Sequence, residues 1–251
     1  MPVREIERHP YLSMGQIAGS SKLILGSFPV YECTDEDNDY KRVNRLREGT
    51  IRFFYGSNRN SLWSKYKSFI DETINFPWNP DEIIDSLESR GISVSDLITS
   101  CERYIYKSNK KGERILFPYS SEDSALHNVK WNYEGIQELI SHGVKKILCT
   151  SKGVLSSLEK QVIFKNGFGT ADIELSKSFQ QNFITEIGGE LKSITKPIAK
   201  TFLIKTHLVE AIALPSPGSP QRQIKEFGFN GDNWRVYVEA YFERAFRWLV
   251  L

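Results

Sequence analysis

The chain has 251 residues, of which 40% are hydrophobic and 25% charged, with a net charge of +2, so it can bury a sizeable core. No apolar run approaches the ~18 to 20 residues of a membrane span, and segment 1–12 carries charges where a signal peptide needs an apolar centre, so a cytoplasmic location is expected. The odd, scattered set Cys33, Cys101 and Cys149 supports neither a disulfide framework nor a zinc or iron–sulfur site.

The first part of the chain predicts a strand, two helices and a second strand. The apolar run KLILG, 22–26, is closed by glycine and proline, as a buried strand entering a tight turn is. Apolar residues at helical spacing predict a helix within 61–74, and a second helix is bounded by Asn79 as its cap and Gly91 as its stop. The next strand is expected at 92–98.

The middle of the chain predicts a hairpin and a βαβ step. Residues 103–119 alternate around a polar Asn-Lys-Lys-Gly tip, which is typical of a β-hairpin. The amphipathic segment 131–143 ends on glycine and leads into the buried strand 144–151.

Residues 152–200 are poorly periodic, because glycines at 167, 169, 188 and 189 interrupt any long element. We expect a helix at the start of this segment and a loop-rich insertion after it. Strands are then predicted at 201–206 and 208–215, and an amphipathic helix at 232–250.

Strands that alternate with helices predict one three-layer α/β/α domain over 1–251 with a mostly parallel central sheet. Ligands of such sheets bind beyond the carboxyl ends of the strands. That rule selects GSFP at 26–29, the loop after SDLI (95–98), TSKG at 150–153 and PSPGSP at 215–220.

Charge is distributed unevenly near the first of these segments. Acidic side chains dominate 32–39, and a basic run follows at 41–59. A solvated loop is the ordinary explanation, but the position beside a candidate site favours a phosphate-facing role. The basic residues of the run are Lys41, Arg42, Arg45, Arg47, Arg52 and Arg59.

Four segments together resemble the uracil-DNA glycosylase superfamily, most closely its hypoxanthine-DNA glycosylase branch. They are LILGSFP at 23–29, FYGSNRNSLW at 54–63, GISVSDLITSCER at 91–103 and LPSPGSP at 214–220. The resemblance does not extend to 152–200. The chain departs from the family pattern around the expected pocket, which bears on substrate preference; the departures are Val30, Ser57, Asn58 and Ser95.

The resemblance implies that Asn60 is the catalytic asparagine. An amide can orient water and contact a base edge at once, although it is a poor general base. The alternative is that Asn60 only caps the helix that follows.

The resemblance also implies a base pocket whose wall is shaped by GSFP. Phe54 and Tyr55 are candidates to stack on an extruded base, with a core position as the alternative. Asp96 either hydrogen-bonds the site or caps a turn. The candidate base-binding residues are Gly26, Ser27, Phe28, Phe54, Tyr55 and Asp96.

The proline-rich loop 215–223 matches the family segment that presses on the DNA minor groove, and a plain surface turn is the alternative. The candidate DNA-binding residues are Arg59, Lys152, Ser216, Ser219 and Arg222. The histidines share no spacing and are interpreted as surface or ordinary core; they are His9, His127, His142 and His207.

These features predict a monomeric, monofunctional DNA glycosylase of base-excision repair, which flips a deaminated base and needs no metal or redox cofactor. Hypoxanthine is the first expected substrate and uracil the second. One alternative is a superfamily member that binds nucleic acid or a nucleotide without cleaving it. Another is an α/β enzyme acting on a small phosphorylated metabolite, which would leave the basic run unexplained.

Overall fold

The computed structural model describes residues 6–34, 49–108, 112–117 and 123–251. Most of the acidic and basic runs lies outside the described residues, including Lys41, Arg42, Arg45 and Arg47. Among the described residues, no helix combines the length and the apolar character needed to cross a lipid bilayer.

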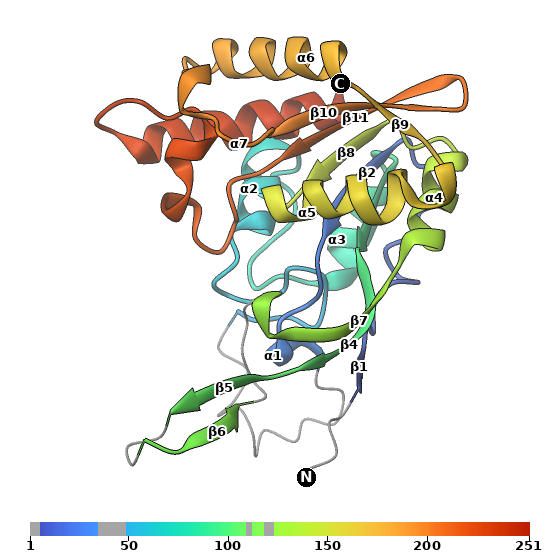
Figure 1. The fold of residues 1–251 in the computed structure, drawn as a ribbon, viewed down its shortest axis with the longest axis vertical. Coiled ribbons are helices and arrows are strands. Elements are labelled where there is room, and N and C mark those ends of the chain that lie inside the picture. The colour runs from blue at the N-terminus through green and yellow to red at the C-terminus, as the bar shows by residue number, and fades with distance from the viewer. Residues whose placement is uncertain (1–5, 35–48, 109–111, 118–122) are drawn as a thin grey trace.

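The largest sheet of the described chain has six strands (Figure 1). Their order is β3 (Ile92–Asp96), β2 (Lys22–Gly26), β8 (Lys146–Cys149), β11 (His207–Ala213), β10 (Ala199–Ile204) and β9 (Thr170–Asp172). Strands β3, β2, β8 and β11 run parallel, whereas β10 is antiparallel to both of its neighbours. The predicted α/β class is therefore confirmed, but the large sheet is mixed and only partly parallel, where a mostly parallel sheet was predicted.

A second, antiparallel sheet was not predicted from the sequence. It consists of β1 (Ile6–Arg8), β4 (Ile98–Arg103) and β7 (Leu126–Trp131) in the order β1-β4-β7. Leu97 alone separates β3 from β4, so the chain passes directly from the large sheet into the small one. The predicted hairpin is present as β5 (Ile105–Ser108) and β6 (Arg114–Phe117), which extend away from the two sheets (Figure 1).

Seven α-helices accompany the strands in the described chain. They are α1 (Tyr31–Thr34), α2 (Leu62–Phe69), α3 (Pro80–Glu88), α4 (Tyr133–Ser141), α5 (Lys152–Ser157), α6 (Ile173–Glu186) and α7 (Trp234–Val250). Shorter helical turns are η1 (Asp123–Ala125), η2 (Leu158–Ile163), η3 (Lys165–Gly167), η4 (Leu191–Ser193), η5 (Pro220–Arg222) and η6 (Ile224–Phe227). The predicted cap of α3 is confirmed, because Asn79 Oδ1 accepts the Asp81 N–H at 3.0 Å.

Aromatic side chains hold the helices together. Tyr66 of α2 lies 6.1 Å from Phe246 of α7, and Phe183 of α6 lies 5.0 Å from Tyr241 of α7, measured between ring centroids. Helix α5 contacts β8 and β11 instead, and Figure 1 shows it in front of the sheet with α7 behind. In these two ring pairs, only Tyr66 comes from the first half of the chain, and the other three rings belong to α6 and α7.

The loop-rich expectation for 152–200 was wrong at 173–186, where the chain forms α6. Asp172 caps this helix by accepting the Leu175 N–H at 3.0 Å. The glycines stand before and after α6 and do not interrupt it, so they mark its boundaries.

Candidate active site

A cavity of about 530 Å³ lies at the carboxyl ends of β2, β3 and β8. Its size falls within the roughly 300–1,000 Å³ usual for small-molecule sites. Three of the segments selected from the sequence contribute to its lining, and SDLI contributes through its strand residue Asp96, not through the loop after it. They supply residues 27–30, Asp96, residues 150–151 and residues 216–219.

Backbone hydrogen bonds hold these strand ends in register. Leu97 N donates to Gly26 O at 2.9 Å, and Thr150 N donates to Leu25 O at 2.9 Å. The proline-rich loop is attached to the segment before α2, because Ser61 donates both its N–H and its Oγ–H to Pro217 O, at 3.2 and 2.8 Å. Ser61 and Pro217, which lie 156 positions apart in the chain, therefore belong to one rim of the cavity.

Asn60 lines the cavity and also caps the helix that follows. Its Oδ1 accepts the Leu62 N–H at 2.9 Å, so the capping interpretation and the cavity position both apply. Within the described residues, no hydrogen bond occupies its Nδ2 group. The donor end of the amide is therefore the end available to a ligand.

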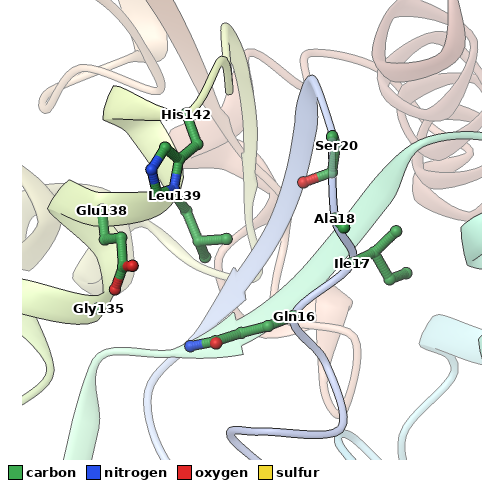
Figure 2. Close-up of a pocket in the computed structure, with 9 residues that line it drawn as sticks. Gln16, Ile17, Ala18, Ser20, Gly135, Glu138, Leu139 and His142 are labelled. Atoms are coloured by element: carbon green, nitrogen blue, oxygen red, sulfur yellow. The ribbon is translucent and has the colours of Figure 1, made fainter.

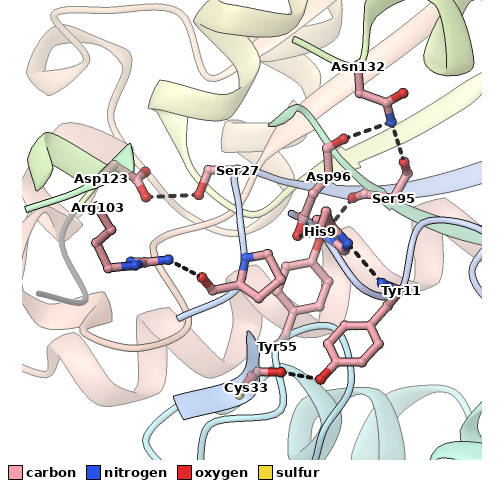
Figure 3. A network of polar contacts seen from close by, with 11 residues as sticks. His9, Tyr11, Ser27, Cys33, Tyr55, Ser95, Asp96, Arg103, Asp123 and Asn132 are labelled. Atoms are coloured by element: carbon pink, nitrogen blue, oxygen red, sulfur yellow. Dashed lines mark hydrogen bonds and ion pairs between the residues drawn. The ribbon is translucent and has the colours of Figure 1, made fainter. Parts of the chain in front are cut away.

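Asp96 is the centre of a buried polar network at the cavity (Figure 3). His9 Nε2 lies 2.8 Å from Asp96 Oδ2, and the two side chains are 0% and 2% exposed. Tyr55 donates its hydroxyl to Asp96 Oδ1 at 3.2 Å, and Asn132 Nδ2 donates to the Asp96 carbonyl at 3.0 Å. Asp96 does not cap a turn with its side chain, because both carboxylate oxygens accept hydrogen bonds from side chains of distant segments.

The hydrogen bonds of His9 fix its tautomer. The backbone N–H of Tyr11 donates to Nδ1 at 3.1 Å, so Nδ1 carries no proton. The proton is then on Nε2, which donates it to Asp96. His9 is a core residue, as expected from the sequence, because its side chain is 0% exposed and lies outside the cavity lining. Its ring also donates a hydrogen bond to a cavity carboxylate.

Tyr55 lines the cavity in a left-handed backbone conformation, with φ of 54°. Burial raises the pKa of its hydroxyl well above the usual value, and the charge of Asp96 raises it further, so Tyr55 remains a proton donor. Gly26 leaves the space for this contact. A Cβ at Gly26 would lie 2.3 Å from Asp96 Oδ1 and 2.5 Å from the Tyr55 hydroxyl.

A second carboxyl group, Asp123 of η1, faces the same cavity and was missed in the sequence. Ser27 Oγ donates to its Oδ1 at 2.9 Å. Although Asp123 is exposed as a residue, desolvation of its carboxyl raises the pKa, and the charge of Asp96 adds to this. The Ser27 hydrogen bond and the Arg103 charge act in the opposite direction without reversing the shift.

Of the two predicted phenylalanines, one lines the cavity and the other lies in the core. Phe28 lines the cavity with the Arg103 guanidinium 5.6 Å from its ring centroid, and Arg103 also binds the Pro29 carbonyl at 2.7 Å. Phe54 is 0% exposed and lies outside the lining, with its ring 5.0 Å from that of His9. The core alternative therefore holds for Phe54, which cannot stack on a base.

The candidate DNA-binding residues also differ in position: four line the cavity and one does not. Arg59 and Arg222 line the cavity and are exposed, and Ser216 and Ser219 lie beside them as half-buried residues. Lys152 does not line the cavity. Its Nζ pairs with Glu226 and lies 5.3 Å from the Phe227 ring centroid, so it attaches α5 to η6.

A second cavity of about 330 Å³ lies between residues 16–20 and helix α4 (Figure 2). Residues 16–20 run beside β3, because Ser93 Oγ accepts the Ile17 N–H at 3.0 Å. The labelled side chains Gln16, Glu138 and His142 surround this space. No strand-end segment from the sequence prediction contributes to it, so the cavity at Asp96 is the candidate active site.

In comparisons with known proteins, no family model and no curated protein matches the chain. The functional assignment therefore depends on the cavity itself. Two side chains of the site carry no sequence signal of their own: Asp123 lines the cavity, and His9 contacts the lining residue Asp96. His9 and Asp123 reach the site only through the small β1-β4-β7 sheet, whose short strands have weak alternation.

Proposed function

We propose that the chain is a DNA glycosylase of base-excision repair, which flips a deaminated base out of DNA and hydrolyses its N-glycosidic bond. Hypoxanthine is the first expected substrate and uracil the second. The observation that carries the proposal is one cavity that unites Asn60, Asp96 and Phe28 with the 216–219 loop. The α/β fold is compatible with a three-layer uracil-DNA glycosylase-like domain, which would act as a monomer without metal or redox cofactor.

The cavity offers each group that base release needs. The sugar gains positive character in the transition state, which the Asp96 carboxylate stabilises, and the departing base gains negative character, which the Asn60 Nδ2 donor stabilises. The Phe28 ring offers a stacking face worth roughly 1–3 kcal/mol. Arg59 and Arg222 at the rim suit the DNA phosphates.

The second candidate function is binding of nucleic acid or a nucleotide without cleavage. The observation that favours it is the hydrogen bond from Leu62 N to Asn60 Oδ1, because this capping contact accounts for an asparagine at position 60 without catalysis.

The test is a panel of duplexes that each contain one hypoxanthine, uracil or xanthine, followed by alkaline cleavage at abasic sites. Asn60→Asp keeps the capping oxygen and removes the amide donor, so we expect base release to fall about 10²-fold or more while duplex affinity changes little. Asn79→Asp is the matched control, because it makes the same change at a residue whose Oδ1 accepts the Asp81 N–H at 3.0 Å and which lies outside the cavity lining. Duplex binding without release of any of the three bases would favour the second candidate.

A further inference from the structure

Two carboxyl groups line the cavity, and their surroundings differ. Asp96 accepts hydrogen bonds on both oxygens, from His9 Nε2 at 2.8 Å and the Tyr55 hydroxyl at 3.2 Å. Within the described residues, Asp123 accepts one side-chain hydrogen bond, from Ser27 Oγ to Oδ1 at 2.9 Å. In Figure 3, Asp123 lies beside Ser27 at one side of the network, and Asp96 lies nearer its centre, close to Ser95 and His9.

Two hydrogen-bond donors hold the carboxyl group of Asp96. Because Nδ1 of His9 accepts the Tyr11 N–H, Nε2 presents its proton to Asp96, and the Tyr55 hydroxyl also acts as a donor. These two donors fix the orientation of the carboxylate at the cavity. Asp96 is therefore suited to accept a proton from water or to stabilise a sugar cation.

The surroundings of Asp123 favour its protonated form. Burial of the carboxyl raises its pKa, and the Asp96 charge raises it further. The charged groups that face it are Asp96 from β3 and Arg103 from β4, while Arg59 and Arg222 lie on the cavity rim. The Ser27 contact engages Oδ1, so Oδ2 is the oxygen on which a proton would be carried.

We propose that Asp96 and Asp123 form a general base and general acid pair, with His9 and Tyr55 as positioning residues for the base. This inference rests on the proposed glycosylase function and deepens it. Water attacks the anomeric carbon as its proton moves to Asp96, and the bond from that carbon to the base breaks. Asp123 transfers its proton to a ring nitrogen of the departing base, which leaves as a neutral molecule.

The pair specifies the class of substrate. A purine has ring nitrogens outside the glycosidic bond that can accept a proton, so protonation makes it a better leaving group. Uracil can leave as an anion that hydrogen-bond donors stabilise, without a proton from the enzyme. Asp123 therefore contributes more to release of hypoxanthine than to release of uracil.

The experiment is single-turnover release from hypoxanthine and uracil duplexes, measured across pH for the wild type, Asp96→Asn and Asp123→Asn. The wild type should show a bell-shaped profile with hypoxanthine. Asp123→Asn should lower its plateau about 10²- to 10⁴-fold, remove the alkaline decline and affect uracil release less. Asp96→Asn should remove the acidic limb. Asp85→Asn, an exposed carboxylate on α3, is the control that should change nothing.

The outcomes separate the two proposals. If the wild type releases no base, the proposed function fails. If it releases hypoxanthine and Asp123→Asn keeps both the rate and the pH profile, the acid–base pair is overturned while the glycosylase remains. Because Asp96 is buried and its substitution can unfold the chain, Asp123→Asn, at an exposed residue, is the decisive variant, and Asp123→Glu should restore part of the rate.

Discussion

The two sheets that meet at Leu97 contribute different parts of the candidate site. The six-stranded sheet supplies the cavity wall through the strand ends at Ser27, Asp96 and Thr150. The β1-β4-β7 sheet supplies groups that contact those walls, because His9 follows β1, Arg103 ends β4 and Asp123 precedes β7. The large sheet thus forms the space, and the small sheet supplies groups that contact its walls.

This difference has a physical origin. Parallel strands end at one edge, so any strand-end side chain of the large sheet is brought to the cavity by topology alone. Side chains of the small sheet reach the cavity only because β3 continues into β4 through a single residue, Leu97. Substitutions can therefore be chosen that affect one sheet's contribution and leave the other intact.

The largest effect is expected from His9→Leu, which removes the small sheet's contact to Asp96. A buried carboxylate left without its partner costs about 3 kcal/mol of unfolding free energy, and base release should fall with it. Urea denaturation and single-turnover release measure the two effects. His9→Gln can restore a donor and should recover part of both, and His142→Leu, at the exposed residue that follows α4, should cost nothing. Wild-type stability in His9→Leu would contradict the network.

Gly26→Ala tests the contribution of the large sheet. The added Cβ would lie 2.3 Å from Asp96 Oδ1, so the carboxylate or Tyr55 must move. Overpacking of this kind costs about 1–3 kcal/mol, and we expect a matching loss of base release. Gly153→Ala is the control, because its Cβ would meet Ser151 Oγ at an ordinary 3.5 Å. Equal effects of the two variants would show that Gly26 provides no special space.

The variants Arg222→Met and Lys152→Met allow a comparison between an exposed cation at the cavity rim and a buried cation that is paired with Glu226. Arg222 is exposed at the cavity, so its loss should reduce the salt dependence of duplex affinity by about one unit of slope. Lys152 is paired with Glu226, so its loss should leave the slope unchanged and lower the melting temperature instead. Binding titrations at several salt concentrations distinguish them. A weaker salt dependence of duplex affinity for Lys152→Met would show that Lys152 contacts DNA after all.

The smallest effect is the pH dependence of stability at Asp123. Its folded-state pKa is raised above 3.8 by burial and by Asp96, so the folded protein retains this proton at pH values where the unfolded chain has lost it. Stability relative to Asp123→Asn should therefore fall as the pH rises above 3.8 through the folded-state value. Urea denaturation of both proteins at about pH 4 and pH 7 measures this. A gain in the stability of the wild type relative to Asp123→Asn at the higher pH would contradict the upward shift of this pKa.

The sequence predicted the large sheet well and the small one poorly. KLILG at 22–26 forms a strand with the expected bounds, because a continuous apolar run between turn residues has few other uses. Strand β1 has three residues with no clear alternation, and its pairing with β4 spans more than 90 positions, so no local pattern reveals it. Helix α6 was missed because its apolar face is narrow.

The candidate site shows the same division. Strand-end logic brought Ser27, Asp96 and the 216–219 loop together correctly. It could not separate Phe54 from Tyr55, since which of two adjacent rings faces a cavity depends on the backbone turn, here the left-handed conformation of Tyr55. Nor could it find His9, whose role depends on one long-range hydrogen bond.

The most direct test is a crystal structure of the protein with a duplex that carries a non-cleavable 2′-fluorinated deoxyinosine. The account predicts that the hypoxanthine ring leaves the helix and occupies the cavity between Phe28 and Asn60, with its glycosidic bond near Asp96 and its ring edge near Asp123. A hypoxanthine that stays stacked in the duplex, or that lies outside this cavity, would contradict it.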